Sequence, residues 1–185
     1  MRAAVLTLLA FFASAAAADE LLWQKLKAEP NLVVLMRHTQ PAPGNNPLLW
    51  DETGDCKGET MLTPAGIAHA KRIGEAFRVR GIKPAVLSSP MCRCRDTARL
   101  AFGDPVRTDP QLREISSADS ARARLFETTA QSLISRHRGQ DPVVLVTHRP
   151  NIDLLTMELI AEGELLVGRA NDKGEVEVLG RMSIQ

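Results

Sequence analysis

Two arginines and two histidines occupy positions from which they could bind a multiply charged anion. Arg37 and His38 follow the apolar run of residues 32–36, and His148 follows another apolar run. Arg93 lies in the first turn of a predicted helix. Guanidinium groups bind phosphate oxygens in pairs, and a neutral imidazole can act as a nucleophile. These residue types together favour phosphate chemistry.

The elements that must position these residues alternate between buried strands and amphipathic helices. The sequence predicts strands at 32–37, 85–87 and 142–146, helices at 22–28, 63–79, 88–101, 120–138 and 150–161, and a hairpin at 165–168 and 176–179. Such alternation is typical of an α/β fold, here a three-layer αβα sandwich with a mainly parallel central sheet. Ligands in these sheets bind beyond the carboxyl ends of the strands, which is where Arg37, His38 and His148 are placed.

Two long loops flank this expected site. Residues 39–62 are rich in Pro, Gly and Asn, and residues 103–122 lie mostly between predicted elements. Loops of this length in compact domains often have a function, and we expect substrate specificity to lie in them. Trp50, within the first loop, either lines a substrate lid or fastens the loop to the core.

Several segments, in this order, resemble the histidine phosphatase superfamily, in its phosphoglycerate mutase-like branch 1. Arg37-His38-Thr39 is similar to the family's signature at the end of the first strand. The further segments that carry the resemblance are LTPAGIAHAKRIGEAF (62–77), SSPMCRCRDTA (88–98), LREI (112–115) and VTHRPNI (146–152). Together they extend over residues 32–155.

The resemblance implies a phosphohistidine mechanism. His38 would be the nucleophile that takes the phosphoryl group, Arg37 and Arg93 would hold its oxygens, and His148 would stabilise its equatorial charge. Glu114 would be the acid that protonates the leaving oxygen. The implied protein is a phosphoric monoester hydrolase of the histidine acid type, with no metal and no cofactor.

A few positions depart from the family's pattern. Thr39 stands where many members have glycine, and its hydroxyl either binds phosphate or caps the turn. The family's frequent asparagine has no clear counterpart, although Asn45 and Asn46 lie nearby. Arg149 follows the second histidine and is either a substrate ligand or a solvated side chain. Ser88 and Ser89 are most simply interpreted as helix caps.

The sequence lacks the motifs, with their spacing, of other phosphatases and hydrolases. A cysteine phosphatase needs Arg six positions after its nucleophile, but Cys92 leads to Ala98 and Cys94 to Leu100. The G-x-x-x-x-G-K-[ST] and G-x-S-x-G motifs do not occur. The four histidines are dispersed rather than paired as in zinc sites.

The first eighteen residues are typical of a signal peptide. MRAAVLTLLAFFASAAAA has one Arg, an apolar run and an A-x-A site before Asp19. We therefore expect residues 19–185 to form a single secreted, periplasmic domain without a membrane span; the alternative is that the apolar segment stays as a single N-terminal anchor. Removing Arg2 from 23 basic residues leaves 22, against 22 acidic ones, and a neutral chain gives no reason to expect a nucleic-acid partner.

Three cysteines are present, and in an oxidising compartment two of them should pair. Cys92 and Cys94 are too close to bridge within a helix, so Cys56 is expected to pair with one of them. The alternative is three reduced, buried thiols. Secreted members of the resembled family also have a cysteine in the first loop and one before the helix arginine, which favours Cys56–Cys92.

The predicted function is an exported phosphomonoesterase that acts on a small phosphate ester. A cell-envelope sugar phosphate, a nucleotide, a phytate-like polyphosphate and a phosphoprotein remain open as substrates. One alternative is a non-catalytic protein that binds or senses a phosphorylated ligand. The other is a phosphomutase, which export disfavours. No sequence feature indicates an oligomeric state.

Overall fold

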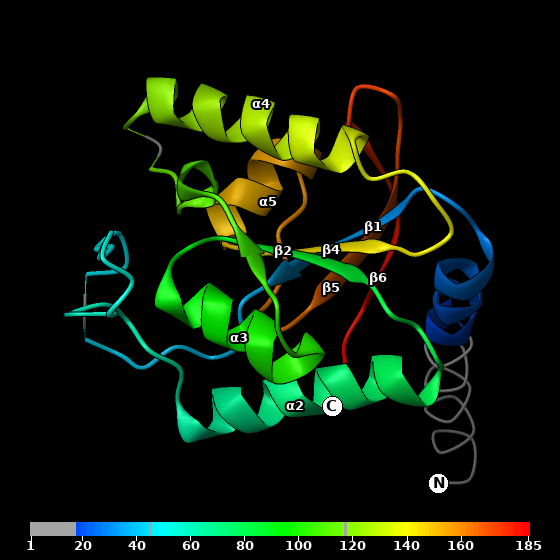
Figure 1. The fold of residues 1–185 in the computed structure, drawn as a ribbon, viewed down its shortest axis with the longest axis horizontal. Coiled ribbons are helices and arrows are strands. Elements are labelled where there is room, and N and C mark those ends of the chain that lie inside the picture. The colour runs from blue at the N-terminus through cyan, green and yellow to red at the C-terminus, as the bar shows by residue number, and fades with distance from the viewer. Residues whose placement is uncertain (1–17, 45, 117) are drawn as a thin grey trace, which may run out of the picture.

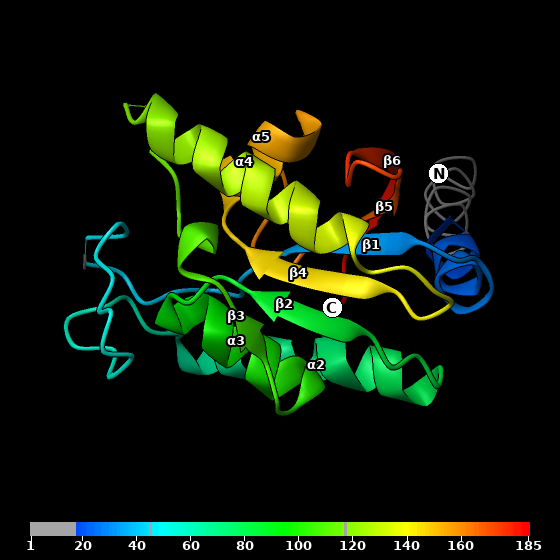
Figure 2. The same cartoon turned by 45° about the horizontal axis from the view of Figure 1, so that its top comes forward.

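The computed structural model describes residues 18–44, 46–116 and 118–185. Its elements are a helical segment at 18–28, β1 (Leu32–Arg37), α2 (Pro64–Val79), β2 (Ala85–Ser88), α3 (Cys92–Phe102), β3 (Arg107–Thr108), a 3₁₀ turn (Pro110–Leu112), α4 (Ser120–Ser135), β4 (Val143–Thr147), α5 (Arg149–Thr156), β5 (Leu165–Ala170) and β6 (Val176–Met182). Helices α2 and α3 cover one face of the sheet, and α4 and α5 cover the other (Figures 1 and 2).

The sheet has six strands in the order β3-β2-β4-β1-β5-β6. The pairs β1–β4, β2–β4 and β2–β3 are parallel, whereas β5 and β6 add an antiparallel edge. This architecture confirms the predicted αβα sandwich. The hairpin predicted near the C-terminus is also confirmed as β5 and β6.

The core divides into two clusters because successive residues of β1 point to opposite faces of the sheet. Val34 and Met36 pack with Phe77 on the α2 side. Val33 and Leu35 pack with Phe126 on the α4 side. Both faces of β1 are therefore buried, which explains its uninterrupted apolar sequence.

Helix α2 begins as the sequence predicts. The Thr63 hydroxyl accepts a hydrogen bond from Gly66 N at 3.0 Å, and Pro64 occupies the first turn. The prediction for α5 is wrong in length, because this helix ends at Thr156 rather than near residue 161. Met157 adopts a left-handed conformation with φ 59°, which stops the helix.

Other elements also differ from the prediction, and the first helix already includes residue 18, before its predicted start at 22. Strand β3, only two residues long, was not expected, since Arg107 and Thr108 are exposed and carry no apolar pattern. Helix α3 begins at Cys92, after Pro90 and Met91 have turned the chain. Helix α4 ends at Ser135, about a turn before residue 138.

Within the described residues, no helix is long and apolar enough to span a membrane. The predicted signal segment lies almost wholly at residues 1–17, outside the described part of the chain.

Candidate functional site

The two strand-end histidines lie side by side at the carboxyl edge of the sheet. Arg37 and Thr147 are register partners on the parallel strands β1 and β4, so His38 and His148 follow at the same level. The His38 amide donates to Thr147 O at 3.1 Å, which continues the pairing by one residue. The two imidazole centroids are 5.5 Å apart. The topology therefore creates the histidine pair that the sequence predicts.

Two glycines allow other backbone segments to approach the residues that follow β1 closely. The Gly163 amide donates to both Arg37 O and His38 O, at 3.1 and 3.2 Å. Gly66 lies in the first turn of α2, where an added Cβ would stand 2.3 Å from Gln40 O. These close approaches fix the backbone around His38 from two sides.

His38 is held as a neutral imidazole with one nitrogen available. Its Nδ1 lies 2.9 Å from Thr39 O, a carbonyl that can only accept, so Nδ1 carries the proton and donates. Nε2 is then the lone-pair nitrogen, and it accepts from Arg93 Nε at 3.3 Å. Burial lowers the pKa of His38 to about 3; the Thr39 hydrogen bond opposes this shift, and the charges of Arg93 and Arg37 add to it. The ring is therefore uncharged at neutral pH, with its lone pair on Nε2.

Arg93 joins the groups of the site. Its side chain is only 2% exposed. Besides His38, its Nη2 donates to Pro47 O at 2.8 Å and to His148 Nδ1 at 3.2 Å, and it forms an ion pair with Glu114. Its buried Nη1 has no hydrogen-bond partner among the described residues. A buried donor without a partner is costly, so this N–H is well suited to a phosphoryl oxygen.

Arg37 supplies a second guanidinium. Its Nη2 pairs with Glu162 at 3.0 Å, and its buried Nε has no partner within the described residues. Burial lowers the pKa of Arg37; Glu162 opposes this shift, and repulsion from Arg149 and Arg93 adds to it. Arg149 is exposed but close enough to act on Arg37. Positive charge thus exceeds negative charge around this point.

His148 is completely buried and is oriented by Ser89. The Ser89 hydroxyl lies 2.8 Å from His148 Nε2 and accepts from Met91 N at 3.3 Å. Cys94 Sγ lies 3.5 Å from His148 Nε2, and burial raises the pKa of this thiol, so it is an uncharged neighbour. Burial, followed by the charge of Arg93, holds the pKa of His148 well below its usual range. Arg93 can only donate to Nδ1, so the neutral ring carries its proton on Nε2 and donates it to the Ser89 hydroxyl.

Glu114 is brought to the same point from the loop after β3. Asn151 fixes the backbone on both sides of it, since its Oδ1 accepts from Ile115 N at 3.2 Å and its Nδ2 donates to Arg113 O at 2.9 Å. Burial raises the pKa of Glu114, whereas Arg93 and then Arg37 lower it. A partly buried carboxyl whose pKa is raised can carry a proton to a leaving group.

Thr39 is turned towards α3. Its hydroxyl lies 3.1 Å from Thr97 Oγ1, and its amide donates to the same oxygen at 3.2 Å. Thr97 in turn donates to Arg93 O at 2.7 Å. Thr39 and Thr97 therefore connect the backbone beside His38 to the helix that carries Arg93.

The loop between β1 and α2 is fastened beside Arg93 by a disulfide between Cys56 and Cys92, as the resemblance implied. Cys94 is the free, buried thiol. Glu59, 2% exposed, accepts from Asp51 N and from Cys92 N, each at 2.8 Å. The loop that provides Pro47 O is thus tied to the first turn of α3 by a covalent bond and a buried carboxylate.

The disulfide should contribute measurably to stability. Replacing Cys56 and Cys92 with Ser should lower the free energy of unfolding by about 2–4 kcal/mol, because the bond closes a long loop in the unfolded chain. Urea denaturation of the oxidised protein, the reduced protein and the double variant measures this effect. The latter two should agree, and equal midpoints for all three would contradict the prediction.

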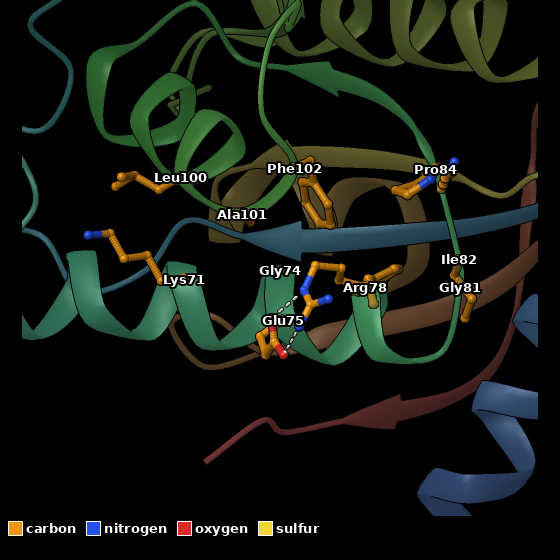
Figure 3. A pocket seen from close by; sticks show the side chains of 12 residues that line it. Lys71, Gly74, Glu75, Arg78, Gly81, Ile82, Pro84, Leu100, Ala101 and Phe102 are labelled. Carbon is orange, nitrogen blue, oxygen red and sulfur yellow. Dashed lines mark hydrogen bonds and ion pairs between the residues drawn. The ribbon is translucent and has the colours of Figure 1, made fainter.

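A separate cavity of about 610 Å³ lies at the other end of the helices. It is lined by residues from the ends of α2 and α3, including the exposed Arg78–Glu75 ion pair (Figure 3). This is the amino edge of the parallel strands, opposite the histidines. The cavity contains no histidine and no buried charged group. The candidate site is therefore the polar cluster at the carboxyl edge of the strands, not this larger cavity.

The structure thus brings His38, His148, Arg37, Arg93 and Glu114 together, as predicted. It leaves Arg149 exposed at the edge and turns Thr39 towards Thr97. Supporting residues that sequence reasoning did not identify are Ser89 in its contact with His148, Asn151, Pro47, Glu59 and Thr97. The only sequence signal for most of them was their position within the blocks that resemble the family. The described residues include no group of three or more His, Cys, Asp or Glu placed to hold a metal ion.

Known structures share this arrangement of strands and helices. A protein histidine phosphatase, SixA, complexed with tungstate aligns with a TM-score of 0.60 at 17% identity over 82% of this chain and 96% of its own. Phosphoserine phosphatase from Entamoeba histolytica, in complex with phosphoserine, gives 0.57 at 16% identity over 83% and 98%. A mycobacterial glucosyl-3-phosphoglycerate phosphatase with bound VO₃ gives 0.57 at 18% over 75% and 92%. At these identities the likeness concerns the fold.

No curated protein sequence matches the chain. Residues 33–131 match the family described as histidine phosphatase superfamily (branch 1). This match covers more than half of the 185 residues and contains Arg37, His38, Arg93 and Glu114. The chain belongs to branch 1 of the histidine phosphatase superfamily.

Proposed function

We propose that this protein is an exported, metal-independent phosphomonoesterase that transfers a phosphoryl group from a small phosphate ester to His38 and then to water. The observation that carries the proposal is the state of His38. Its Nδ1 is bonded to Thr39 O at 2.9 Å, and its unprotonated Nε2 faces the Arg93 guanidinium at 3.3 Å. A nucleophilic nitrogen with a fixed tautomer therefore stands beside the group that would hold its target.

In the first step, His38 Nε2 attacks phosphorus as the bond to the ester oxygen breaks. The leaving oxygen takes the proton of Glu114 and departs as an alcohol. Arg37, Arg93 and His148 surround the phosphoryl oxygens, whose negative charge persists through the transfer. Fixed charges in a water-poor site lower the barrier because they do not have to reorganise.

In the second step, the carboxylate of Glu114 takes a proton from water, and the resulting nucleophile attacks the phosphohistidine. Inorganic phosphate leaves, and His38 regains its lone pair while Nδ1 keeps its proton. The Arg93–Glu114 ion pair places the acid-base group beside the guanidinium that holds phosphate. Both half-reactions can therefore use one carboxyl group.

The substrate class is proposed from similar proteins and from the site. Two similar structures are a phosphoserine phosphatase and a glucosyl-3-phosphoglycerate phosphatase, both named for small phosphate esters. SixA, by its name, acts on phosphohistidine in proteins, which is the second substrate class to test. The position of Glu114 favours catalysis over a phosphate-binding or sensor role, because a binding protein needs no acid.

Export is proposed from two features of the chain. Residues 1–18 have the composition of a signal peptide. The Cys56–Cys92 bond is of a kind that persists in oxidising compartments. A periplasmic address agrees with both. It disfavours a mutase, whose sugar-phosphate substrates are cytosolic.

Replacing Glu114 with Gln should reveal the acid through the leaving group. We expect kcat/KM for an alkyl phosphate to fall about 10²–10⁴-fold, the usual contribution of general acid catalysis. The loss should be smaller for para-nitrophenyl phosphate, whose leaving group needs no proton. The wild-type kcat/KM for the alkyl ester should also decline as pH rises through the raised pKa of Glu114, because the acid loses its proton. This decline should be absent in the variant.

Glu177→Gln, an exposed position on β6, is the matched control and should retain the wild-type profile. Equal losses for the alkyl and the nitrophenyl ester in Glu114→Gln would show that Glu114 does not protonate the leaving oxygen.

A further inference from the structure

A second, smaller cavity adjoins the proposed acid. It measures about 190 Å³ and is lined by Leu48, Arg113, Glu114, Ser116, Asp119 and Arg122. Leu48 follows Pro47, whose carbonyl accepts from Arg93, and Glu114 forms the ion pair with the same guanidinium. The cavity therefore begins where an ester oxygen would leave the phosphoryl group, and a substituent on that oxygen would extend into it.

Arg113 is held at this cavity by contacts that leave its charge uncompensated. Its guanidinium carbon lies 4.2 Å from the centroid of the Trp50 ring, and its Nε donates to Pro110 O at 3.1 Å. It forms no ion pair with any of the described residues, and nothing there accepts from its two terminal amino groups. A stacked guanidinium keeps its in-plane N–H donors free for a bidentate partner.

Arg122 brings a second guanidinium to the same wall. Its amino groups donate to Gln111 Oε1 at 2.6 Å, Pro110 O at 3.0 Å and Gln111 O at 3.1 Å, all uncharged oxygens. Burial lowers the pKa of Arg122, and the charge of Arg113 lowers it further, against attraction by Asp119 and Asp109. The two arginines are therefore close enough to repel each other.

The acids that line the cavity do not neutralise both arginines. Glu114 is paired with Arg93. Asp119 accepts from the Arg122 amide at 2.9 Å, as the N-cap of α4. Among the lining residues, Asp119 is thus the one carboxylate outside an ion pair, and it faces two guanidinium groups. The apolar wall at Leu48, which is 48% exposed, suits a short carbon chain.

We infer that this cavity is the leaving-group subsite, and that Arg113 and Arg122 select phosphate esters whose leaving group carries a second compact anion, a carboxylate or a phosphate. This inference rests on the proposed function and names the substrate class within it. The volume corresponds to about six water molecules in the liquid, which is enough for a short chain that carries an anion. Trp50 acts as the positioning residue, because its ring holds the plane of the Arg113 guanidinium group.

Three esters that differ only at the far end of a three-carbon chain test the inference. They are 3-(phosphonooxy)propanoate, propane-1,3-diyl bisphosphate and the uncharged isostere 3-(phosphonooxy)propanamide. Calorimetry on the His38→Ala protein, which lacks the nucleophile, measures their dissociation constants without turnover. We expect at least one anionic ester to have a dissociation constant at least about tenfold lower than that of the amide. A single charge-assisted pair is enough to produce a difference of this size. The ratio of the two anionic esters identifies the carboxylate or the phosphate as the preferred group.

Arg113→Gln and Arg122→Gln, each in the His38→Ala protein, should bring the anion-to-amide ratio towards one. Arg124→Gln, an exposed position on α4 outside the cavity, should keep the ratio. Equal affinities for all three esters, or a ratio that survives both substitutions, would overturn the inference.

The proposed function is judged by a separate readout, the turnover of the amide ester and of para-nitrophenyl phosphate by the wild-type protein. Turnover without a binding preference would support the proposed phosphatase function and overturn the subsite. A binding preference without turnover would support an anion-selective cavity and overturn the phosphatase function.

Discussion

His38→Ala is expected to abolish hydrolysis of para-nitrophenyl phosphate in the presence of EDTA, with a loss of roughly 10⁴–10⁶-fold in kcat. Losses of this order follow removal of a nucleophile. His38 provides the only atom in the proposed mechanism that bonds to phosphorus before water does. The Nδ1–Thr39 O hydrogen bond leaves the lone pair on Nε2. Initial rates of the wild-type and variant proteins, at equal concentration, measure the effect.

His137→Ala is the matched control, because this histidine lies beyond the end of α4, away from the site. It should retain wild-type turnover. The unfolding midpoint of His38→Ala should be compared as well, because the variant must be folded for the result to count. A folded His38→Ala protein with more than a few per cent of wild-type activity would contradict the assignment of the nucleophile.

Arg93→Lys is expected to lower kcat/KM by about 10²–10³-fold for every phosphate ester, the usual effect of removing one fixed donor to a developing charge. Lysine keeps the positive charge but loses the planar fork. In this site the fork reaches His38, His148 and Glu114 from one side chain. A single ammonium cannot make all these contacts, so the loss should appear despite the conserved charge. Steady-state kinetics with one alkyl and one aryl ester measure it.

Arg99→Lys is the matched control, because Arg99 lies on the same helix, is exposed and forms an ion pair with Asp96 as its only one among the described residues. It should leave kcat/KM unchanged. If Arg93→Lys retained wild-type kcat/KM with both esters, electrostatic stabilisation by the bidentate guanidinium would be excluded as a major contribution.

The strands and the histidine pair could be predicted because they follow from short-range rules. The apolar run of β1 is buried on both faces, and β4 repeats its pattern, so parallel pairing places His38 beside His148. The Thr63-Pro64 cap likewise identified the start of α2 without tertiary information.

Helix ends and supporting contacts were harder to predict because they depend on tertiary structure. The end of α5 is set by the left-handed Met157, a residue type that gives no such signal in a sequence. Ser89 has the chemistry of a helix cap, and only the fold brings its hydroxyl to His148 across 59 positions. Asn151 similarly fixes Glu114 through contacts with residues 36 and 38 positions away.

The contacts of the long loops could be predicted neither from short-range rules nor from the ends of the helices. Two interpretations of Trp50 were equally compatible with the sequence, and the structure shows it stacked on Arg113, at the side of the cavity. The resemblance implied the Cys56–Cys92 pairing, whereas the spacing of the cysteines alone left Cys94 open. Long loops lack a repeating pattern, so their contacts depend on the surfaces on which they fold.

The central claim is a phosphohistidine at His38, and detection of that intermediate tests it most directly. The wild-type protein should be mixed with para-nitrophenyl phosphate, quenched rapidly in base, where phosphohistidine survives, digested and analysed by mass spectrometry. The account predicts one phosphoryl group, on the peptide containing His38, that is lost on acid treatment and absent from His38→Ala. Steady turnover with no phosphoenzyme, or a phosphoryl group on any other residue, would contradict it.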